Sequence, residues 1–375
     1  MKALNGQHIL IVGASFAGLS SAFWMRELGY DVTVVEVAPA VRAGGTAVNI
    51  QDRTIATVER MGLLEQIREN RLSLRRWDFM NADNRVARSL VVRAPGEPPP
   101  EDDIEIERDV LMRLLLDAVD GRCEIVFGDR VETMHEDDDG VEVTFRSRVR
   151  RRFDLVLGCD GTHSSIRGMW FGPEQDYLHD LRQYFSISIV DKLLIERDTA
   201  QMFNEPCKGV MLNAYKDKTD IIFNFASDQE ISYDHRDPAR QRALIAQQFA
   251  NVGWRAAELL REVEQSGNFY FDRLCQIRMP SWSKGRVVLV GDAAYCPSPA
   301  AGRGGSIAID GAAALADAMR RADADHATAF RAYEDEFRPF VEGIQDEAER
   351  FGLETLLPRT EEAIRQRNSR THAEF

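Results

Sequence analysis

The sequence predicts an α/β fold with a parallel sheet and a second, β-rich domain, and three observations support this prediction. The N-terminal stretch HILIVGASFAGLSSAFWMRELGYDVTVVE has the order strand, tight turn, helix, strand. Two later apolar runs, DLVLG and RVVLVG, are followed within two residues by an aspartate, as parallel strands often are at their ligand-binding ends. The runs GVMLNAY and DIIFNFAS are joined by the turn KDKT, a pattern typical of an antiparallel hairpin.

The first of these units, residues 8–36, has the features of a dinucleotide-binding turn. Gly13 permits the tight turn, and the small Ser15 lets the backbone approach a pyrophosphate. Gly18 lets the helix pack closely on the first strand. The helix N-terminus offers free N–H groups and the positive end of a dipole to phosphates. Glu36, at the end of the second strand, suits the two hydroxyls of an adenosine ribose.

Composition and charge exclude several classes of function. The 375 residues are too many for one small domain, and 44% of them are hydrophobic. The net charge of −14 argues against nucleic acid and anionic membranes, because both attract basic surfaces. No apolar run approaches the roughly 20 residues of a membrane span. The five cysteines form no C-x-x-C pair or metal-ligand cluster, so we expect reduced thiols, a cytoplasmic location and no metal site.

Two further motifs place acids and glycines at the ends of buried strands. Arg108 stands at the start of the amphipathic helix expected in RDVLMRLLLDAV. Asp160 and a glycine follow DLVLG, and Asp292 follows RVVLVG. Carboxylates accept hydrogen bonds from sugar-type hydroxyls, and GRGG at 302–305 presents backbone N–H groups at the start of a helix. Taken singly, each has a plain structural reading, such as a common D-G turn.

In this order and spacing, the three motifs resemble those of the class A FAD-dependent monooxygenases, the aromatic hydroxylases of the p-hydroxybenzoate hydroxylase type. The length, the short tail and the segment AGGTAVNI are most similar to the compact branch that includes tetracycline-inactivating monooxygenases. The resemblance implies a Rossmann-like FAD-binding domain of the GR2 type, with an inserted β-sheet substrate domain and a C-terminal helix. It also implies that NAD(P)H reduces a non-covalently bound FAD, and that dioxygen forms a flavin hydroperoxide that oxygenates an aromatic or polyketide-like molecule.

The resemblance also assigns the motif residues to parts of the cofactor. The glycine turn holds the pyrophosphate, Glu36 binds the adenosine ribose, and Arg108 lies against the cofactor. Asp160 lies near the pyrophosphate, in a motif linked to pyridine-nucleotide use. Asp292 binds the ribitol chain, and residues 299–304 run along the flavin ring. The expected cofactor-binding residues are Gly13, Ser15, Phe16, Ala17, Glu36, Val37, Arg108, Val131, Asp160, Gly291, Asp292, Pro299, Gly302, Gly304, Gly305 and Ser306.

Three positions depart from the family pattern. Tyr295 stands where histidine is usual, Arg303 where glutamine is frequent, and Ser306 where asparagine is common. These changes leave the backbone architecture intact and mark positions where substrate preference is expected to differ. We expect Cys296 to be inert packing and His235 to be exposed. The candidate substrate contacts, with buried structural roles as the alternative, are Met211, Asn213, Tyr215, Asn224 and Tyr295.

The expected domains are discontinuous. The FAD-binding domain comprises residues 1–75, 101–172 and 276–325, and the substrate-binding sheet comprises residues 76–100 and 173–275. Residues 326–375 form a helical tail, for which we expect a break near the proline at position 339.

Several alternatives share this fold. The sequence contains one dinucleotide turn, so nicotinamide is expected to bind transiently, and disulfide reductases and Baeyer–Villiger-type enzymes are disfavoured. The remaining alternatives are an FAD-dependent halogenase, although no W-x-W-x-I-P motif is present, a lipid reductase, or a catalytically idle flavin-binding protein. We expect a monomer or dimer whose partners are a small molecule and dioxygen, with no nucleic acid or membrane partner.

Overall fold

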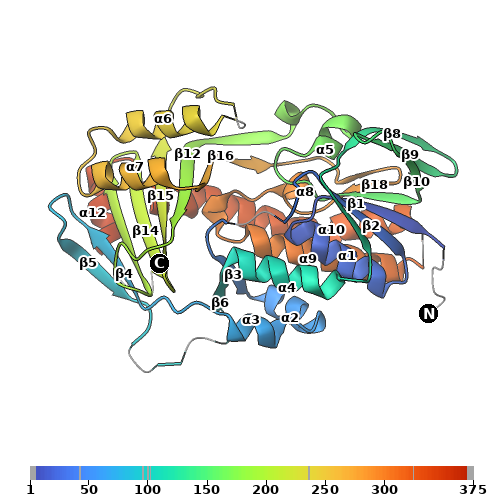
Figure 1. Cartoon of the computed structure of the whole chain (residues 1–375), viewed down its shortest axis with the longest axis horizontal. Coiled ribbons are helices and arrows are strands. Elements are labelled where there is room, and N and C mark those ends of the chain that lie inside the picture. The colour runs from blue at the N-terminus through green and yellow to red at the C-terminus, as the bar shows by residue number, and fades with distance from the viewer. Residues whose placement is uncertain are drawn as a thin grey trace.

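Two β-sheets organise the fold and lie toward opposite ends of the long axis (Figure 1). The computed structural model describes residues 6–41, 44–94, 97–98, 101, 103–234, 237–323 and 325–369. Helices α1, α4, α9 and α10 lie beside the sheet that contains β1 and β2, and α6 and α7 lie over the other sheet. None of the helices in these ranges is both long enough and apolar enough to cross a membrane.

The first sheet has the strand order β17-β18-β11-β1-β2-β7, with every pair parallel except β17 and β18. The inner strands β1, β2, β11 and β18 are buried along most of their length, as expected of a parallel sheet covered by helices. Its strands are β1 His8–Val12, β2 Asp31–Glu36, β7 Glu124–Phe127, β11 Leu155–Gly158, β17 Ser283–Lys284 and β18 Val287–Leu289. The main helices beside it are α1 Phe16–Glu27, α4 Arg108–Val119, α9 Gly304–Arg321 and α10 His326–Glu347.

Two small antiparallel sheets complete this part of the molecule. One contains β8 Val131–Asp137, β9 Gly140–Phe145 and β10 Arg150–Phe153. The basic run RSRVRRR at residues 146–152 reaches into β10, and its arginines are exposed or half-buried. The other pairs β3 Val48–Gln51 with β6 Asp103–Ile106.

The second large sheet has the strand order β16-β12-β15-β14-β13-β4-β5, with β13 and β4 parallel and the other pairs antiparallel. Alternate residues of β14 and β15, such as Leu212 and Phe223, pack against α6 Pro238–Phe249 and α7 Ala256–Gln265. The opposite face of the sheet is therefore turned toward the rest of the molecule. The strands are β4 Arg76–Met80, β5 Val86–Val91, β12 Leu178–Val190, β13 Thr199–Glu205, β14 Lys208–Tyr215, β15 Lys218–Ala226 and β16 Asn268–Ile277.

The remaining helices are short and lie in the connections between the larger elements. They are α2 Arg53–Arg60, α3 Leu64–Glu69, α5 Ser165–Trp170, α8 Asp292–Tyr295, α11 Leu353–Leu356 and α12 Glu361–Ser369, with the 3₁₀ turns η1 Glu174–Asp176 and η2 Pro299–Ala301 and the π-helical η3 Ala348–Gly352.

The break expected near Pro339 is wrong. Helix α10 continues through Pro339 to Glu347. A proline inside a helix removes one backbone hydrogen bond, but here the helix buries Tyr333, Phe337 and Val341 against the core on either side of it. Packing of this apolar face offsets the loss of the hydrogen bond at Pro339. The regular helix therefore continues to Glu347 and gives way to a π-helical turn at η3.

Candidate active site

The turn after β1 can be built only with glycine at two positions. Gly13 has φ of +104°, and an added Cβ would overlap the carbonyl oxygen of Cys159. A Cβ on Gly18 would overlap the carbonyl oxygen of Gly13. Ser15 is the N-cap of α1, yet its side chain makes no capping bond and the first turn holds no acid. The N–H groups at the start of α1, on Phe16 and its neighbours, are thus available to an anion.

Glu36 stands beside this turn at the end of β2. Its carboxylate accepts hydrogen bonds from the backbone N–H groups of Ala14 at 2.8 Å and Ala38 at 2.9 Å. The side chain is half-buried, so it supports the turn and still faces solvent on one side. The adjacent Val37 is 49% exposed, whereas Val131 is buried at the start of β8. Of these two expected cofactor contacts, the structure leaves only the Val37 side chain accessible.

The N-termini of α1, α4 and α9 meet around one aromatic ring. The guanidinium of Arg108 lies 5.4 Å from the ring centroid of Phe16 and donates a hydrogen bond to the carbonyl oxygen of Gly44 at 3.2 Å. On another side of this ring, a Cβ added to Gly305 would lie 3.4 Å from Phe16. Three segments far apart in sequence are therefore brought together at Phe16.

Asp160 is engaged within the protein. Its carboxylate accepts hydrogen bonds from the Ser164 hydroxyl at 2.5 Å and from the backbone N–H groups of Ser165 at 2.7 Å and Ile166 at 3.2 Å. It therefore stabilises the N-terminus of α5 and shapes the loop after β11. The resemblance implied that Asp160 lies near the pyrophosphate. The hydrogen bonds that the structure shows for Asp160 are to the loop after β11 and the start of α5.

The loop after β18 is packed tightly at its start. Gly291 has φ of +70°, and an added Cβ would lie 2.8 Å from the Cβ of Ala17 on α1. Asp292 follows as the first residue of α8 and is half-buried. Burial raises the pKa of its carboxyl to about 6, and a hydrogen bond with Cys296 opposes that rise. Asp292 is thus an accessible acid in a poorly solvated place.

The end of the same loop exposes bare backbone. Pro299 opens η2, and Gly302 closes it with φ of +64°. Arg303 is the N-cap of α9 without a side-chain capping bond, and the first turn of the helix holds no acid. A Cβ added at Gly302 or Gly304 would meet nothing within 4 Å. The positive end of the α9 dipole is therefore open to a ligand with partial negative charge.

Two of the family departures join α9 to the segment around β3. The Arg303 guanidinium pairs with Asp52 at 2.6 Å. The Ser306 hydroxyl donates a hydrogen bond to the carbonyl oxygen of Asn49 at 2.5 Å. Both side chains are thus directed to β3 and the start of α2, and the contacts that they make there hold the N-terminus of α9 in place.

The third departure, Tyr295, lies in the core and does not fit the expected substrate contact. It is 1% exposed, and its hydroxyl is 2.8 Å from the hydroxyl of Tyr333 on α10. Its ring centroid is 4.5 Å from that of Trp282. A Cβ on Gly311 of α9 would overlap its hydroxyl. These contacts give Tyr295 a packing role between the flavin loop, α9 and α10, away from the face of the seven-stranded sheet.

The other four substrate candidates share one face of the seven-stranded sheet. Met211, Asn213 and Tyr215 alternate along β14, and Asn224 lies on β15 opposite Gly209. The intervening residues pack against α6 and α7, so these four point away from the helices.

The four candidates divide into two environments. Met211 packs with Trp77 and Leu356, and a Cβ on Gly209 would overlap the side-chain oxygen of Asn224. The C-terminal segment therefore covers this end of the sheet face.

The other end of the face meets β6. The Tyr215 hydroxyl donates a hydrogen bond to Asp220 at 2.9 Å, and Asn213 hydrogen-bonds to Glu105. Burial raises the pKa of both carboxyls to about 7. Asn213 and Tyr215 thus lie in a polar contact between the sheet and the first domain.

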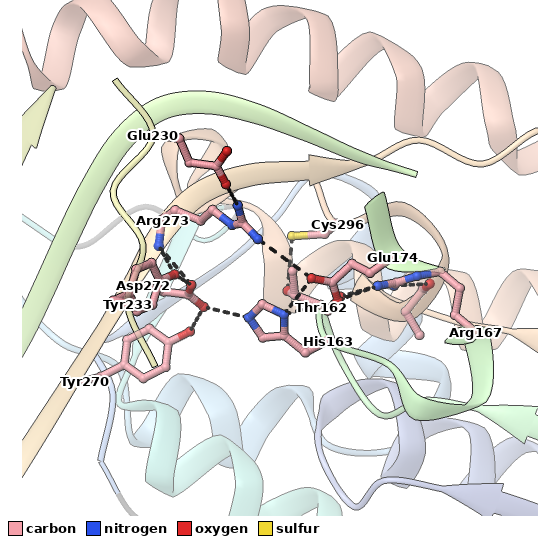
Figure 2. Close-up of polar contacts among 11 residues, drawn as sticks. Thr162, His163, Arg167, Glu174, Glu230, Tyr233, Tyr270, Asp272, Arg273 and Cys296 are labelled. Atoms are coloured by element: carbon pink, nitrogen blue, oxygen red, sulfur yellow. Dashed lines mark hydrogen bonds and ion pairs between the residues drawn. The ribbon is translucent and has the colours of Figure 1, made fainter. Parts of the chain in front are cut away.

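A polar cluster that the sequence analysis did not identify links the D-G loop to β16 (Figure 2). His163 contacts Glu174 at 3.1 Å through Nδ1 and Asp272 at 3.4 Å through Nε2. These hydrogen bonds, first to Asp272 and then to Glu174, raise the pKa of His163 to about 9, so the imidazole is charged at neutral pH. Asp272 also accepts hydrogen bonds from Tyr233 and Tyr270 at 2.5 and 2.7 Å.

The residues of this cluster are far apart in the sequence, and no short motif contains them. His163 stands three residues after Asp160, and Tyr270 and Asp272 alternate along β16. Only the chain's folding brings these positions together. His235 lies outside the described residues.

A comparison with protein families decides the identity of the chain. The family model described as "FAD binding domain" matches residues 7–348. A flavin-dependent monooxygenase of an unknown prokaryotic organism is 33% identical over 340 residues, covering 90% of this chain and 87% of that protein. The chain belongs to the FAD-dependent monooxygenases.

Other similarities to this monooxygenase agree. An uncharacterized protein of Mycobacterium tuberculosis is 38% identical over 341 residues, covering 90% of this chain and 91% of that protein. The crystal structure of the tetracycline destructase Tet(51) has a TM-score of 0.86 at 31% identity, covering 96% of this chain and 94% of that one. Klebsiella pneumoniae HpxO complexed with FAD and uric acid has a TM-score of 0.76 at 21% identity, covering 99% and 95% of the two chains, and it shows the same fold. The resemblance stated from the motifs is confirmed.

The site of the monooxygenase fits FAD. Two helix N-termini without capping side chains, those of α1 and α9, provide donors for phosphate and for the electron-rich edge of a flavin. Glu36 and Asp292 are carboxylates of the kind that accept hydrogen bonds from sugar-type hydroxyls. Gly302 and Gly304 have open space where a Cβ would stand, so a planar ring could approach the backbone there.

Proposed function

We propose that this monooxygenase uses NAD(P)H to insert one oxygen atom of dioxygen into an aromatic or polyketide-like small molecule. The observation that carries the proposal is the convergence of the α1, α4 and α9 N-termini on Phe16. One uncapped N-terminus suits a pyrophosphate and another suits a flavin ring, and both belong to the domain that faces the seven-stranded sheet. Bound FAD supplies the redox and oxygen-activating chemistry.

The chain's own residues hold the cofactor and set its electrostatics. The N–H groups at the start of α1 bind the pyrophosphate, and Glu36 and Asp292 accept hydrogen bonds from sugar and ribitol hydroxyls. Arg108, above Phe16, lies against the cofactor. The N–H groups after Gly302 and the dipole of α9 stabilise negative charge at the pyrimidine end of the reduced ring.

The electron donor binds only transiently in this proposal. Among the described strands and helices, the unit β1–α1–β2 carries the only glycine-rich turn of the dinucleotide type. NAD(P)H then approaches the flavin from solvent and leaves after reducing it. All five cysteines are free thiols, which suits a reducing cytoplasm.

In this proposal the substrate binds between the flavin loop and the face of the seven-stranded sheet that carries Met211, Asn213, Tyr215 and Asn224. Apolar contacts of this face reach the flavin loop, since Phe185 on β12 belongs to a cluster that includes Ala300. Because the similar structure Tet(51) is a tetracycline destructase, tetracycline is a rational first polyketide to test.

The experiment is a coupled measurement on the purified, FAD-loaded protein. NADH or NADPH oxidation and hydrogen peroxide release are followed with tetracycline and a panel of phenols. A true substrate accelerates NAD(P)H oxidation and lowers the peroxide released per NAD(P)H, because oxygen is transferred to it. A protein that binds FAD yet never oxidises NAD(P)H with any probe is an idle flavoprotein. Turnover that requires halide ions identifies a halogenase.

A further inference from the structure

Strand β16 presents one row of side chains to the flavin domain. Phe269 and Phe271 pack on the sheet face covered by α6 and α7. Asn268, Tyr270 and Asp272 therefore point to the opposite face, because side chains alternate along a strand. Asn268 is the first residue of β16, and β16 is an edge strand of the seven-stranded sheet. The three side chains therefore follow one edge of this sheet.

Both neighbours of Tyr270 in this row contact the flavin domain. The Asn268 side chain fills the space beside Gly44, where an added Cβ would overlap it. Gly44 in turn accepts a hydrogen bond from Arg108, which lies over Phe16. At the other end, Asp272 contacts His163 in the loop after β11. Tyr270 thus lies between two residues of its strand that each contact the first domain.

Tyr270 is accessible although protein surrounds it. The residue is 46% exposed, whereas Asp272 beside it is 7% exposed. Burial nevertheless raises the pKa of the Tyr270 hydroxyl well above its ordinary value, and the charge of Asp272 adds to the rise. A ligand can therefore reach the Tyr270 side chain. Its ring centroid is 5.7 Å from that of Phe185, which packs in the cluster with Ala300 of the flavin loop.

The hydroxyl of Tyr270 has a defined direction. It donates its one proton to Asp272 at 2.7 Å (Figure 2). Although burial alone would raise the pKa of Asp272, the hydrogen bond and the positive charge of His163 lower it, so Asp272 remains an ionised acceptor. The Tyr270 oxygen is left with lone pairs only.

We propose that Tyr270 contacts the substrate, and that its oxygen accepts a hydrogen bond from a hydroxyl or N–H group of an aromatic ring lying against Phe185. The inference rests on the monooxygenase function proposed above. It makes Tyr270 a specificity residue, because a ligand that lacks the donor would leave this oxygen unpaired in a poorly solvated place. Asp272 and His163 are positioning residues that fix the direction of the hydroxyl.

The test compares phenols with their methyl ethers on the FAD-loaded enzyme. Binding of phenol against anisole, and of 1-naphthol against 1-methoxynaphthalene, is read from the change in the flavin absorbance spectrum. We expect the wild-type enzyme to bind each phenol about tenfold more tightly than its ether, and Tyr270→Phe to lose this preference. Tyr270→Leu, which also lacks the acceptor, is a second variant in case the first is poorly folded.

Tyr233→Phe is the matched control. It removes an equivalent hydrogen bond to Asp272 from a tyrosine whose ring packs against Phe271, on the other face. Tyr233→Phe should keep the phenol preference. A preference retained in both Tyr270 variants overturns the inference and leaves the proposed function standing, as does an equal loss in Tyr233→Phe. An enzyme that neither binds nor oxygenates any aromatic probe refutes the proposed function and this inference together.

Discussion

Gly291 and Ala17 lie so close that a Cβ on the glycine would come within 2.8 Å of the alanine methyl. The contact joins the end of the strand β18 to the first turn of α1, and the same Cβ would lie 3.5 Å from Ala308 on α9. The two helices whose N-termini lack capping side chains, α1 and α9, are therefore brought together at one glycine. The backbone at Gly291 also has φ of +70°, a conformation that favours glycine over other residues.

Gly291→Ala should destabilise the protein and reduce its flavin content. The strained backbone and the overlap with Ala17 together should lower the free energy of unfolding by about 2 kcal/mol or more. Thermal denaturation and the ratio of flavin to protein absorbance measure both effects. Gly343→Ala is the control, because Gly343 lies within α10 and an added Cβ there meets nothing within 4 Å. Equal behaviour of the two variants would show that the Gly291 contact is not essential.

Arg108→Gln should weaken FAD binding several-fold and leave the protein folded. The substitution removes the positive charge that would face the cofactor, and the backbone segment at Gly44 loses its hydrogen bond. Loss of the cation–π contact with Phe16 should also lower the free energy of unfolding by about 1 kcal/mol. Titrating the apoprotein with FAD and following flavin fluorescence gives the dissociation constant. Arg113→Gln changes an exposed arginine of the same helix and should bind FAD like the wild type. Unaltered affinity in Arg108→Gln would place Arg108 away from the cofactor.

Tyr295→Phe should lower stability by about 1 kcal/mol and leave FAD binding intact. The variant loses one buried hydrogen bond to Tyr333, while its ring keeps the contact with Trp282. Denaturant unfolding of Tyr295→Phe, Tyr333→Phe and the double variant measures the coupling between the two hydroxyls. Loss of bound flavin in Tyr295→Phe would contradict the structural role assigned to it.

Stability should fall as the pH rises through about 9, because of His163. Its pKa is raised from 6.5 to about 9 by its hydrogen bonds to Asp272 and Glu174, so the folded state holds the proton more tightly than the unfolded state. This contribution is fully present below about pH 6.5 and is lost as the folded-state group deprotonates. Melting temperatures between pH 6 and 10 measure it. His163→Gln should flatten this part of the profile, whereas His179→Gln should not; an unchanged profile in His163→Gln would refute the assignment.

Local sequence patterns were enough to predict the flavin domain. Gly13, Gly18 and Glu36 stand at fixed offsets within one strand–turn–helix–strand unit, so their roles follow from chain geometry over a short distance. The same holds for Gly291 and the glycines that begin α9. The hairpin of β14 and β15 follows from alternation and a turn.

Contacts between distant segments were not predictable in this way. Tyr295 was expected at the ligand because it lies in the flavin loop, yet its rotamer directs it to Tyr333, 38 residues later. His163 and Asp272 are 109 residues apart and share no local motif. The continuity of α10 through Pro339 also depends on packing that only the folded chain provides.

The most direct test of the central claim is the fate of oxygen during turnover. The FAD-loaded protein is incubated with NADPH, or NADH, under dioxygen labelled with heavy oxygen, with tetracycline and phenols as probes, and the products are analysed by mass spectrometry. A flavin-dependent monooxygenase incorporates one labelled oxygen atom per product molecule and consumes NAD(P)H in proportion. Products that take their oxygen from labelled water, or NAD(P)H oxidation that yields only hydrogen peroxide with every probe, would contradict the account.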